Sequence, residues 1–276
     1  MTHRQILETA VTQLNDAGIA DAGNDAWLLF SDTFSMNRTD YFMHSSDEGD
    51  LDLCSLYYEK VERRRNHEPL QYIIGKACFM GMDFCVNPDV LIPRFDTEVL
   101  VEETLKLLNP GDRVLDMCTG SGCIAISLSL LKDVTVTAAD ISEAALKVAS
   151  HNREIHNAVK VSPVQSNMFE NITGEYDLIV SNPPYIRTGD IKDLEIEVKD
   201  KEPLLALDGH EDGLFFYRIL IEQGASFLKK DGILIMEIGY DQSEDIKKLL
   251  QKNKYADIRV IKDLAGLDRV VMGRRK

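Results

Sequence analysis

The chain has 276 residues, and its 31 Lys and Arg against 46 Asp and Glu give a formal net charge of −15. A hydrophobic fraction of 44% and a charged fraction of 28% are those of an ordinary globular protein, which excludes a disordered, collagen-like or small disulfide-rich chain. The acidic balance disfavours a protein that grips a nucleic-acid backbone by bulk charge, because that needs Lys and Arg to displace counterions.

The sequence lacks segments that would direct it to a membrane or to an oxidising compartment. No apolar run reaches the ~18–20 residues of a membrane span, and residues 1–14 lack the basic and apolar regions of a secretory signal. The five cysteines are scattered, with no Cys-x-x-Cys pair and no zinc-like spacing. We therefore expect a cytoplasmic protein with reduced thiols, no membrane partner and no metal site.

The first 75 residues predict a small helical domain. Apolar residues recur three or four positions apart over 6–17, 24–34 and 53–65, which is the period of amphipathic helices. The last of these helices ends in the basic run 63–65, which is either part of a docking surface or an ordinary solvated helix end, and we favour the second. Residues 77–92 follow, with aromatic and apolar side chains around a glycine, and predict a β-hairpin joint.

From residue 94 the pattern alternates between helices and strands. We expect helices at 97–108, 124–131, 143–152, 214–228 and 242–251, and strands at 113–117, 134–139, 161–165, 176–181, 232–238, 257–261 and 269–272. This alternation predicts an α/β fold whose seven-stranded, mostly parallel sheet is covered on both faces, with the last two strands antiparallel at an edge. The expected division is a helical domain at 1–75, a hairpin linker at 76–93 and an α/β domain at 94–276.

The first chemical signal is a glycine-rich turn. Residues 113–122 read Arg-Val-Leu-Asp-Met-Cys-Thr-Gly-Ser-Gly and join a strand to a helix. Glycines at such a turn let the backbone approach a ligand, and the helix presents free N–H groups. Asp140 ends the next strand, at roughly the 20-residue distance from Asp116 that nucleotide-binding units show, and can accept both hydroxyls of a ribose. Neither a P-loop nor the Gly-x-Gly-x-x-Gly of dinucleotide binders is present.

The second chemical signal is Asn-Pro-Pro-Tyr at 182–185, directly after the apolar strand. The prolines fix the backbone and remove two N–H donors, which leaves the Asn182 side-chain oxygen and the Pro183 carbonyl as acceptors. With the aromatic plane of Tyr185 beside them, these groups suit a planar –NH2 group that donates both hydrogens while it stacks. The alternative is a stiff proline turn whose tyrosine packs on the core.

Both signals resemble known families. The turn after Asp116 resembles class I S-adenosylmethionine-dependent methyltransferases, with Cys118 where that family usually has its first glycine. Residues 182–185 resemble the amino-methyltransferases, which act on adenine, cytosine or glutamine amide nitrogens. Eight further segments resemble the peptide-chain release factor glutamine methyltransferases (PrmC/HemK family) in order, over nearly the whole chain; they are 68–75, 79–84, 91–98, 202–203, 206–209, 211–214, 237–239 and 263–270. Phe95 departs from the proline usual at its position.

The resemblance implies a Rossmann-like class I methyltransferase domain. It implies methyl transfer from S-adenosyl-L-methionine, which becomes S-adenosyl-L-homocysteine, to the N5 amide nitrogen of glutamine in the Gly-Gly-Gln motif of class I release factors. Residues 1–75 would then dock the release factor body. Translation termination would be the process that this modification supports.

The resemblance also implies the residues of the site. Asn182, Pro183 and Tyr185 would be catalytic, and Pro184 would complete the substrate site. The expected cofactor-binding residues are Cys118, Thr119, Gly120, Ser121, Gly122, Asp140, Met168 and Asn182. Met168 is as well explained by core packing, since methionine often fills gaps. Arg94 is either a site residue or an ion-pair partner near the hairpin.

Two other functions share these features. A nucleic-acid adenine or cytosine methyltransferase uses the same tetrapeptide, because an exocyclic base amine has the same planar shape. The net charge of −15 and the lack of a following target-recognition domain argue against it, so we expect no nucleic-acid partner. A non-catalytic module that retains the cofactor fold is disfavoured by the intact motifs at 118–122 and 182–185.

Overall fold

The computed structural model describes residues 1–276, which form two compact units. The first contains residues 1–75 and 195–201, and the second contains residues 76–194 and 202–276. The helical unit is thus built from two stretches of chain, and the second stretch, 195–201, lies in sequence between two parts of the α/β unit. The assignment of separate roles to 1–75, 76–93 and 94–276 stays a prediction.

The helical unit confirms the three predicted helices as α1 (His3–Asp16), α2 (Ala22–Phe34) and α4 (Leu51–Arg65). It also contains α3 (Arg38–His44), α5 (Leu70–Ile74) and α9 (Ile196–Lys199), which are too short to show a hydrophobic period. One signal for α3 was present in the sequence, because Asn37 caps it by accepting the N–H groups of Thr39 at 2.8 Å and Asp40 at 3.0 Å.

Aromatic side chains fill the core of this unit. Phe30 stacks on Phe34 with ring centroids 4.4 Å apart, and Tyr57 meets Phe30 edge-on at 5.7 Å. The Tyr57 hydroxyl donates to the Ala26 carbonyl at 3.0 Å, so its polar end is satisfied inside the core.

The basic run at 63–65 differs from the solvated helix end that we favoured. Arg64 is only 5% exposed and donates to Asp25 at 2.7 Å and to Glu197 of α9 at 2.6 Å. A buried guanidinium needs such partners, because its charge is expensive to remove from water. Arg63 and Arg65 remain at the surface and pair with Glu68 and Glu62.

The second unit begins with the predicted hairpin, formed by β1 (Lys76–Phe79) and β2 (Met82–Cys85). Its main sheet has seven strands in the order β5-β4-β3-β6-β7-β9-β8, and only β9 runs antiparallel to its neighbours. The strands are β3 (Arg113–Met117), β4 (Thr135–Asp140), β5 (Val161–Gln165), β6 (Tyr176–Ser181), β7 (Leu228–Glu237), β8 (Ala256–Lys262) and β9 (Asp268–Arg274). The sheet prediction is confirmed, with β8 alone at the edge and β9 inside it.

β7 begins four residues before its predicted start, because the strand contains an irregularity that reads as a turn. The β6–β7 register shifts between Tyr176 and Leu178, and Asp231 has a left-handed φ of 63°. A turn-like Asp-Gly sequence therefore lies within the strand, at a bulge, rather than before it.

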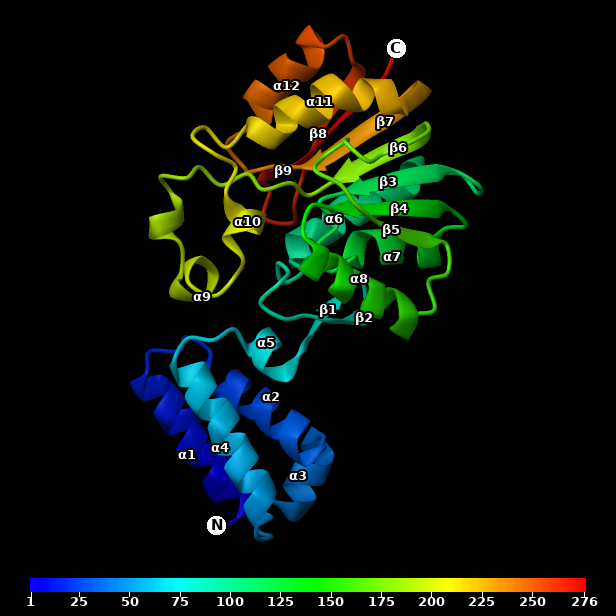
Figure 1. Cartoon of the computed structure of the whole chain (residues 1–276). Helices are drawn as coiled ribbons and strands as arrows, with labels where there is room; N and C mark the ends of the chain where they lie inside the picture. Colours follow the sequence, from blue (N-terminus) through cyan, green and yellow to red (C-terminus); the bar gives the residue numbers. More distant parts are fainter. The chain divides into compact units, whose positions relative to one another are not determined.

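Helices cover both faces of the sheet (Figure 1). One face carries α6 (Phe95–Leu107), α7 (Cys123–Leu131) and α8 (Glu143–Ile155), and the other carries α11 (Phe215–Phe227) and α12 (Ser243–Lys252). Short helices η1 (Ile191–Asp193) and α10 (Leu204–Leu207) lie in the β6–β7 connection and were not predicted. No helix combines the length and apolarity required to cross a bilayer.

The strand order changes direction between β3 and β6, and this switch point sets the position of the site. In register, Met117 of β3 lies beside Ala139 of β4 and Ser181 of β6. The residues that follow these three, Cys118, Asp140 and Asn182, therefore leave the sheet side by side. In open α/β sheets, ligands bind in the crevice outside the carboxyl ends of the strands at such a point.

Candidate active site

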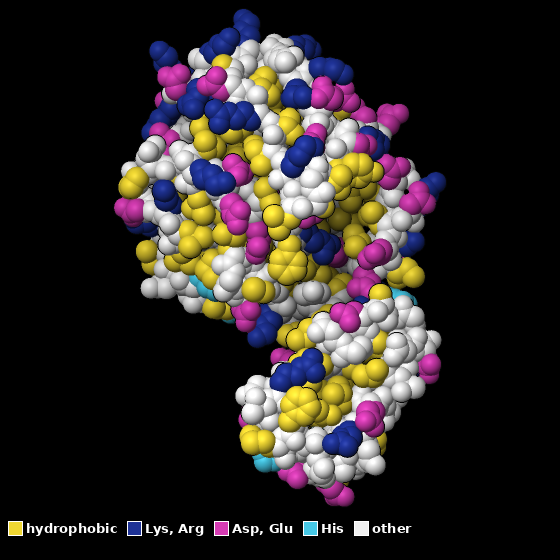
Figure 2. All heavy atoms as spheres, turned by 180° about the vertical axis from the view of Figure 1, so that it is seen from behind, with side chains coloured by type: hydrophobic (Ala, Val, Ile, Leu, Met, Phe, Trp, Pro, Cys, Tyr) yellow, Lys and Arg dark blue, Asp and Glu magenta, His cyan; other side chains and the backbone are white.

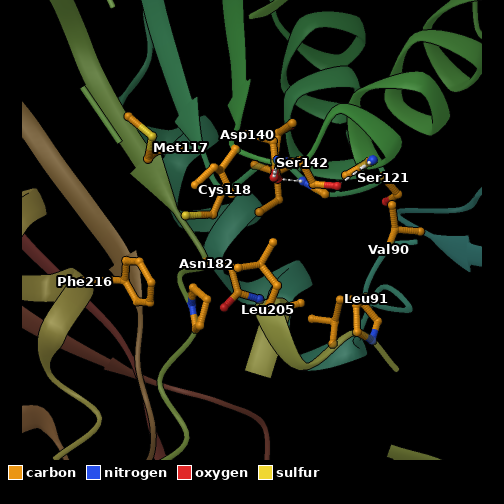
Figure 3. A pocket seen from close by; sticks show the side chains of 18 of the residues that line it. Val90, Leu91, Met117, Cys118, Ser121, Asp140, Ser142, Asn182, Leu205 and Phe216 are labelled. Carbon is orange, nitrogen blue, oxygen red and sulfur yellow. Dashed lines mark hydrogen bonds between the residues drawn. The ribbon is translucent and has the colours of Figure 1, made fainter. Parts of the chain in front are cut away.

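A cavity of about 450 Å³ opens at this edge of the sheet, within the size range of small-molecule sites. Most of the predicted site residues line it, namely Cys118, Thr119, Gly120, Ser121, Asp140, Met168, Asn182 and Pro184. Figure 3 shows Asn182 and the Asp140–Ser142 pair at different ends of the cavity. Gly122, Pro183 and Tyr185 lie outside its lining.

Three of the five residues at 118–122, in the glycine-rich turn, have a left-handed backbone conformation. Cys118, Gly120 and Gly122 have φ of 64°, 54° and 81°. A Cβ at Gly122 would lie 3.1 Å from Cβ of Ala149, so this glycine lets α8 pack closely behind the turn. A Cβ at Gly120 would have no other atom within 4 Å. The left-handed backbone there favours glycine, and the space around the residue is open.

The left-handed backbone at Cys118 predicts a graded response to substitution. Cys118→Gly should change the free energy of unfolding by less than about 1 kcal/mol, because relief of left-handed strain offsets the lost side-chain packing. Cys118→Val should destabilise the fold by about 2 kcal/mol, since a β-branched side chain is a strong outlier at positive φ. Urea unfolding of both variants measures this; equal effects would show that φ at residue 118 does not limit the side chain.

Asp140 is held by the backbone on both of its carboxylate oxygens. One oxygen accepts the Gly120 N–H at 2.9 Å and the other accepts the Ser142 N–H at 2.9 Å. Burial raises the pKa of Asp140, and these N–H groups oppose that rise by favouring the charged form. Each oxygen retains a lone pair for a further donor, which is what a pair of vicinal hydroxyls requires.

Met168 belongs both to the cavity and to the core. It is 8% exposed, lines the cavity and packs in the cluster that contains Phe169 and Tyr176. Its φ of 48° is maintained by Ser166, whose hydroxyl donates to the Met168 carbonyl at 2.6 Å. The two readings of this residue are thus compatible.

Asn182 has one end of its amide fixed by the protein. Its Nδ2 donates to Oγ1 of Thr97 at 3.2 Å. Its Oδ1 and the main-chain oxygen of Pro183 accept no hydrogen bond from the protein. Ser181 anchors the start of this segment by donating to the Met117 carbonyl at 2.7 Å. The site therefore offers two neighbouring acceptors that the protein leaves unpaired.

Segment 208–214 packs closely against Tyr185, the last residue of the tetrapeptide. A Cβ at Gly209 would lie 2.7 Å from Cα of Tyr185, and one at Gly213 would lie 2.5 Å from its carbonyl oxygen. Only glycine permits this approach. Gln242 donates to the same Tyr185 carbonyl at 2.9 Å, and the Tyr185 hydroxyl donates to Glu237 at 3.3 Å.

Several lining residues were not predicted as site residues. Many of them come from 88–97 and from 203–216, and these include Val90, Leu91, Thr97, Leu205, His210 and Phe216. Leu91 and Thr97 lie in segment 91–98, which resembles the family, but that resemblance assigned neither residue a role, and tertiary folding brings all of them to the cavity. Arg94 lines the cavity and forms an ion pair with the buried Glu202, while its role as a site residue stays a prediction.

The charges around the cavity are few. Arg94 is the only Lys or Arg in its lining. No group of three or more His, Cys, Asp and Glu side chains is arranged to hold a metal ion. All five cysteines are unpaired, and burial raises the pKa of Cys123 to about 12, so this thiol stays protonated.

Comparison with known families agrees with this arrangement. The PrmC N-terminal domain family matches residues 5–75, and the methyltransferase small domain family matches residues 94–198. A release factor glutamine methyltransferase of Geobacter sulfurreducens is 38% identical over 275 residues, which cover 99% of this chain and 96% of the relative.

Solved structures share the fold at lower identity. A methyltransferase from Pyrococcus furiosus has a TM-score of 0.56 and 20% identity, covering 72% of this chain and 91% of the other. A 16S rRNA methyltransferase of T. thermophilus, solved in complex with AdoMet and guanosine, has a TM-score of 0.52 and 18% identity, covering 73% and 50%. At these identities the likeness concerns the fold alone.

Proposed function

The chain belongs to the release factor glutamine methyltransferase family, and from this premise we propose that it methylates the glutamine of the Gly-Gly-Gln motif in class I release factors. The methyl group would come from S-adenosyl-L-methionine and would be transferred to the side-chain amide nitrogen, N5. One observation carries the proposal: Asn182, whose side-chain oxygen is free and is followed by the free Pro183 carbonyl, lines the same cavity as Asp140 and the glycine-rich turn.

The cavity suits S-adenosyl-L-methionine. Asp140 would accept the ribose hydroxyls, Cys118 to Ser121 would border the methionine part, and Met168 would lie against the adenine. Gly122 would support the turn from behind. The free lone pairs of Asp140 and the open surroundings of Gly120 support this fit. When bound, the cofactor supplies a methyl group made electrophilic by its sulfonium.

The residues of the tetrapeptide would prepare the substrate amide. An amide nitrogen is a weak nucleophile, because its lone pair is delocalised into the carbonyl. Asn182 and Pro183 would accept its two N–H bonds and direct the nitrogen toward the methyl carbon. Tyr185, which is half-buried, would stack on the amide plane, and Pro184 would close that side. Catalysis is then chiefly positioning and electrostatics, and the methylated nitrogen loses its proton readily without a strong base.

The charges favour a protein acceptor. Arg94, the only cation lining the cavity, is already paired with Glu202, so no basic groove adjoins the acceptors. Acidic and basic side chains are interspersed on the face drawn in Figure 2. We propose residues 1–75 as the docking domain for the release factor, with no nucleic-acid or membrane partner. The reaction would take place in the cytoplasm, where the unpaired cysteines stay reduced.

Labelled S-adenosyl-L-methionine tests this function with three acceptors: a purified class I release factor, tRNA or rRNA, and duplex DNA. We expect label only in the release factor, and none in a release factor whose Gly-Gly-Gln glutamine is replaced by alanine. That variant is the matched control, because it keeps the docking surface and removes the reacting nitrogen. Label in nucleic acid but not in the release factor would overturn the proposal.

A further inference from the structure

A buried carboxyl group lies behind the tetrapeptide. Glu237, the last residue of β7, is 2% exposed. Its Oε1 accepts the Tyr185 hydroxyl at 3.3 Å, whereas its buried Oε2 has no hydrogen-bond partner. An ionisable group in such a place is expensive to bury, so its presence at the end of a central strand requires an explanation.

Thr97 connects this carboxyl group to Asn182. Thr97 is 3% exposed, its Oγ1 accepts Nδ2 of Asn182 at 3.2 Å, and its hydroxyl is one of the groups that lower the pKa of Glu237. A hydroxyl has one proton and two lone pairs. Because one lone pair accepts from Asn182, the proton is available to point toward Glu237.

We propose that Glu237 is a positioning residue that orients both Asn182 and Tyr185. As a carboxylate it accepts the hydroxyl protons of Thr97 and Tyr185. Thr97 is then oriented to accept from Asn182, which keeps Oδ1 of Asn182 turned to the substrate amide. This inference rests on the proposed function for its catalytic consequence, whereas the orientation of Asn182 and Tyr185 by Glu237 does not.

The surroundings of Glu237 set its charge. Arg269 at the start of β9 favours the carboxylate, as do the Thr97 and Tyr185 hydroxyls, whereas burial and Asp96 of α6 oppose it. Cys123 of α7 and the Tyr217 hydroxyl of α11 also face the group, and Tyr217 donates to the Glu237 main-chain oxygen at 2.9 Å. Burial is the largest influence and raises the pKa of Glu237 to about 7. Protonation of Glu237 would give its carboxyl group a hydroxyl donor that opposes the donated hydroxyl protons of Thr97 and Tyr185.

Substitutions at Thr97 give the first test. Thr97→Val keeps the side-chain shape and removes the hydroxyl, and it should lower kcat roughly 10- to 100-fold with the KM for S-adenosyl-L-methionine unchanged. Thr97→Ser retains the hydroxyl and should restore most of the rate. Thr104→Val is the matched control, because Thr104 is fully buried on the same helix and donates only to the Leu100 carbonyl, at 2.7 Å. We expect it to keep wild-type kcat.

The pH dependence gives a second test that a merely structural role would not alter. Wild-type kcat should rise with pH through about 7, and Glu237→Gln should have a lower kcat without this acid limb. The side-chain NH2 signal of Asn182 in NMR spectra should shift with the same apparent pKa in the wild-type protein and stay constant in Glu237→Gln.

These outcomes separate the inference from the proposed function. A wild-type enzyme that leaves release factor unlabelled contradicts the function, while the Asn182 signal still decides whether the connection exists. Active wild-type enzyme with unchanged kcat in Thr97→Val overturns the inference alone. The inference is also overturned if the NMR signal of the Asn182 side-chain NH2 in the wild-type protein does not shift between pH 5 and 9.

Discussion

Replacing Asn182 with alanine should lower kcat for release factor methylation by roughly 10²–10³-fold, the usual loss when one preorganised polar contact to a reacting group is removed. The variant loses the side-chain acceptor of the tetrapeptide, which accepts no hydrogen bond from the protein. The substrate amide then rotates about its remaining contact, and its nitrogen is no longer held in line with the methyl donor. Affinity for S-adenosyl-L-methionine should fall by no more than about tenfold, the value of one hydrogen bond.

The measurement is single-turnover methylation of a release factor, with cofactor binding followed by calorimetry. Asn253→Ala is the control, because Asn253 ends α12, outside the cavity lining, and its amide donates only to Leu249 at 2.9 Å. Turnover by Asn182→Ala equal to that of the control would rule out amide positioning by Asn182. Loss of cofactor binding in proportion to the loss of rate would instead assign Asn182 to the cofactor site alone.

The sequence predicted the framework of this site because its signals are local. A buried parallel strand reads as a continuous apolar run, and β6 shows why: Leu178 and Val180 pack on one face of the sheet and Ile179 on the other. Parallel strands end at one edge, so the residues after β3, β4 and β6 had to meet. Cys118, Asp140 and Asn182 do meet there.

The residues that support the site lie in segments that the family resemblance covers, but the sequence assigned none of them a role. Thr97, Glu237 and Gly213 come from α6, β7 and the segment before α11, and each acts through a contact that tertiary folding creates. The spacing of apolar residues identifies a helix, but it does not show that Thr97 of that helix contacts the distant Asn182. The same holds for Arg64, whose burial depends on Glu197, far along the chain.

Asp116 provides the second large expected effect, on stability rather than on rate. Asp116 is fully buried; Thr119 donates to one of its oxygens at 2.6 Å and the other oxygen has no partner. Burial raises the pKa of Asp116 from 3.8 to about 7 in the folded state. The proton is thus bound more tightly in the folded protein than in the unfolded chain. Stability from this group is full below pH 4 and is lost as pH rises through 7.

Asp116→Asn should remove this pH dependence, because the amide keeps the shape and an acceptor for Thr119 but does not ionise. The free energy of unfolding of the variant minus that of the wild type should increase with pH, by about 4 kcal/mol in total between pH 4 and 8. Contributions from other titrating groups, including Glu237, cancel in this difference. Urea unfolding followed by circular dichroism at several pH values measures it for the α/β unit.

One internal reference sharpens the test. Asp177→Asn should give the opposite slope: burial raises the pKa of Asp177, but the Arg113 N–H and Lys229 outweigh burial and lower it. Its contribution is therefore present at neutral pH and lost as pH falls. If the difference for Asp116→Asn were constant with pH, Asp116 would titrate alike in both states, and the orphaned oxygen would have to be solvated by water within the turn.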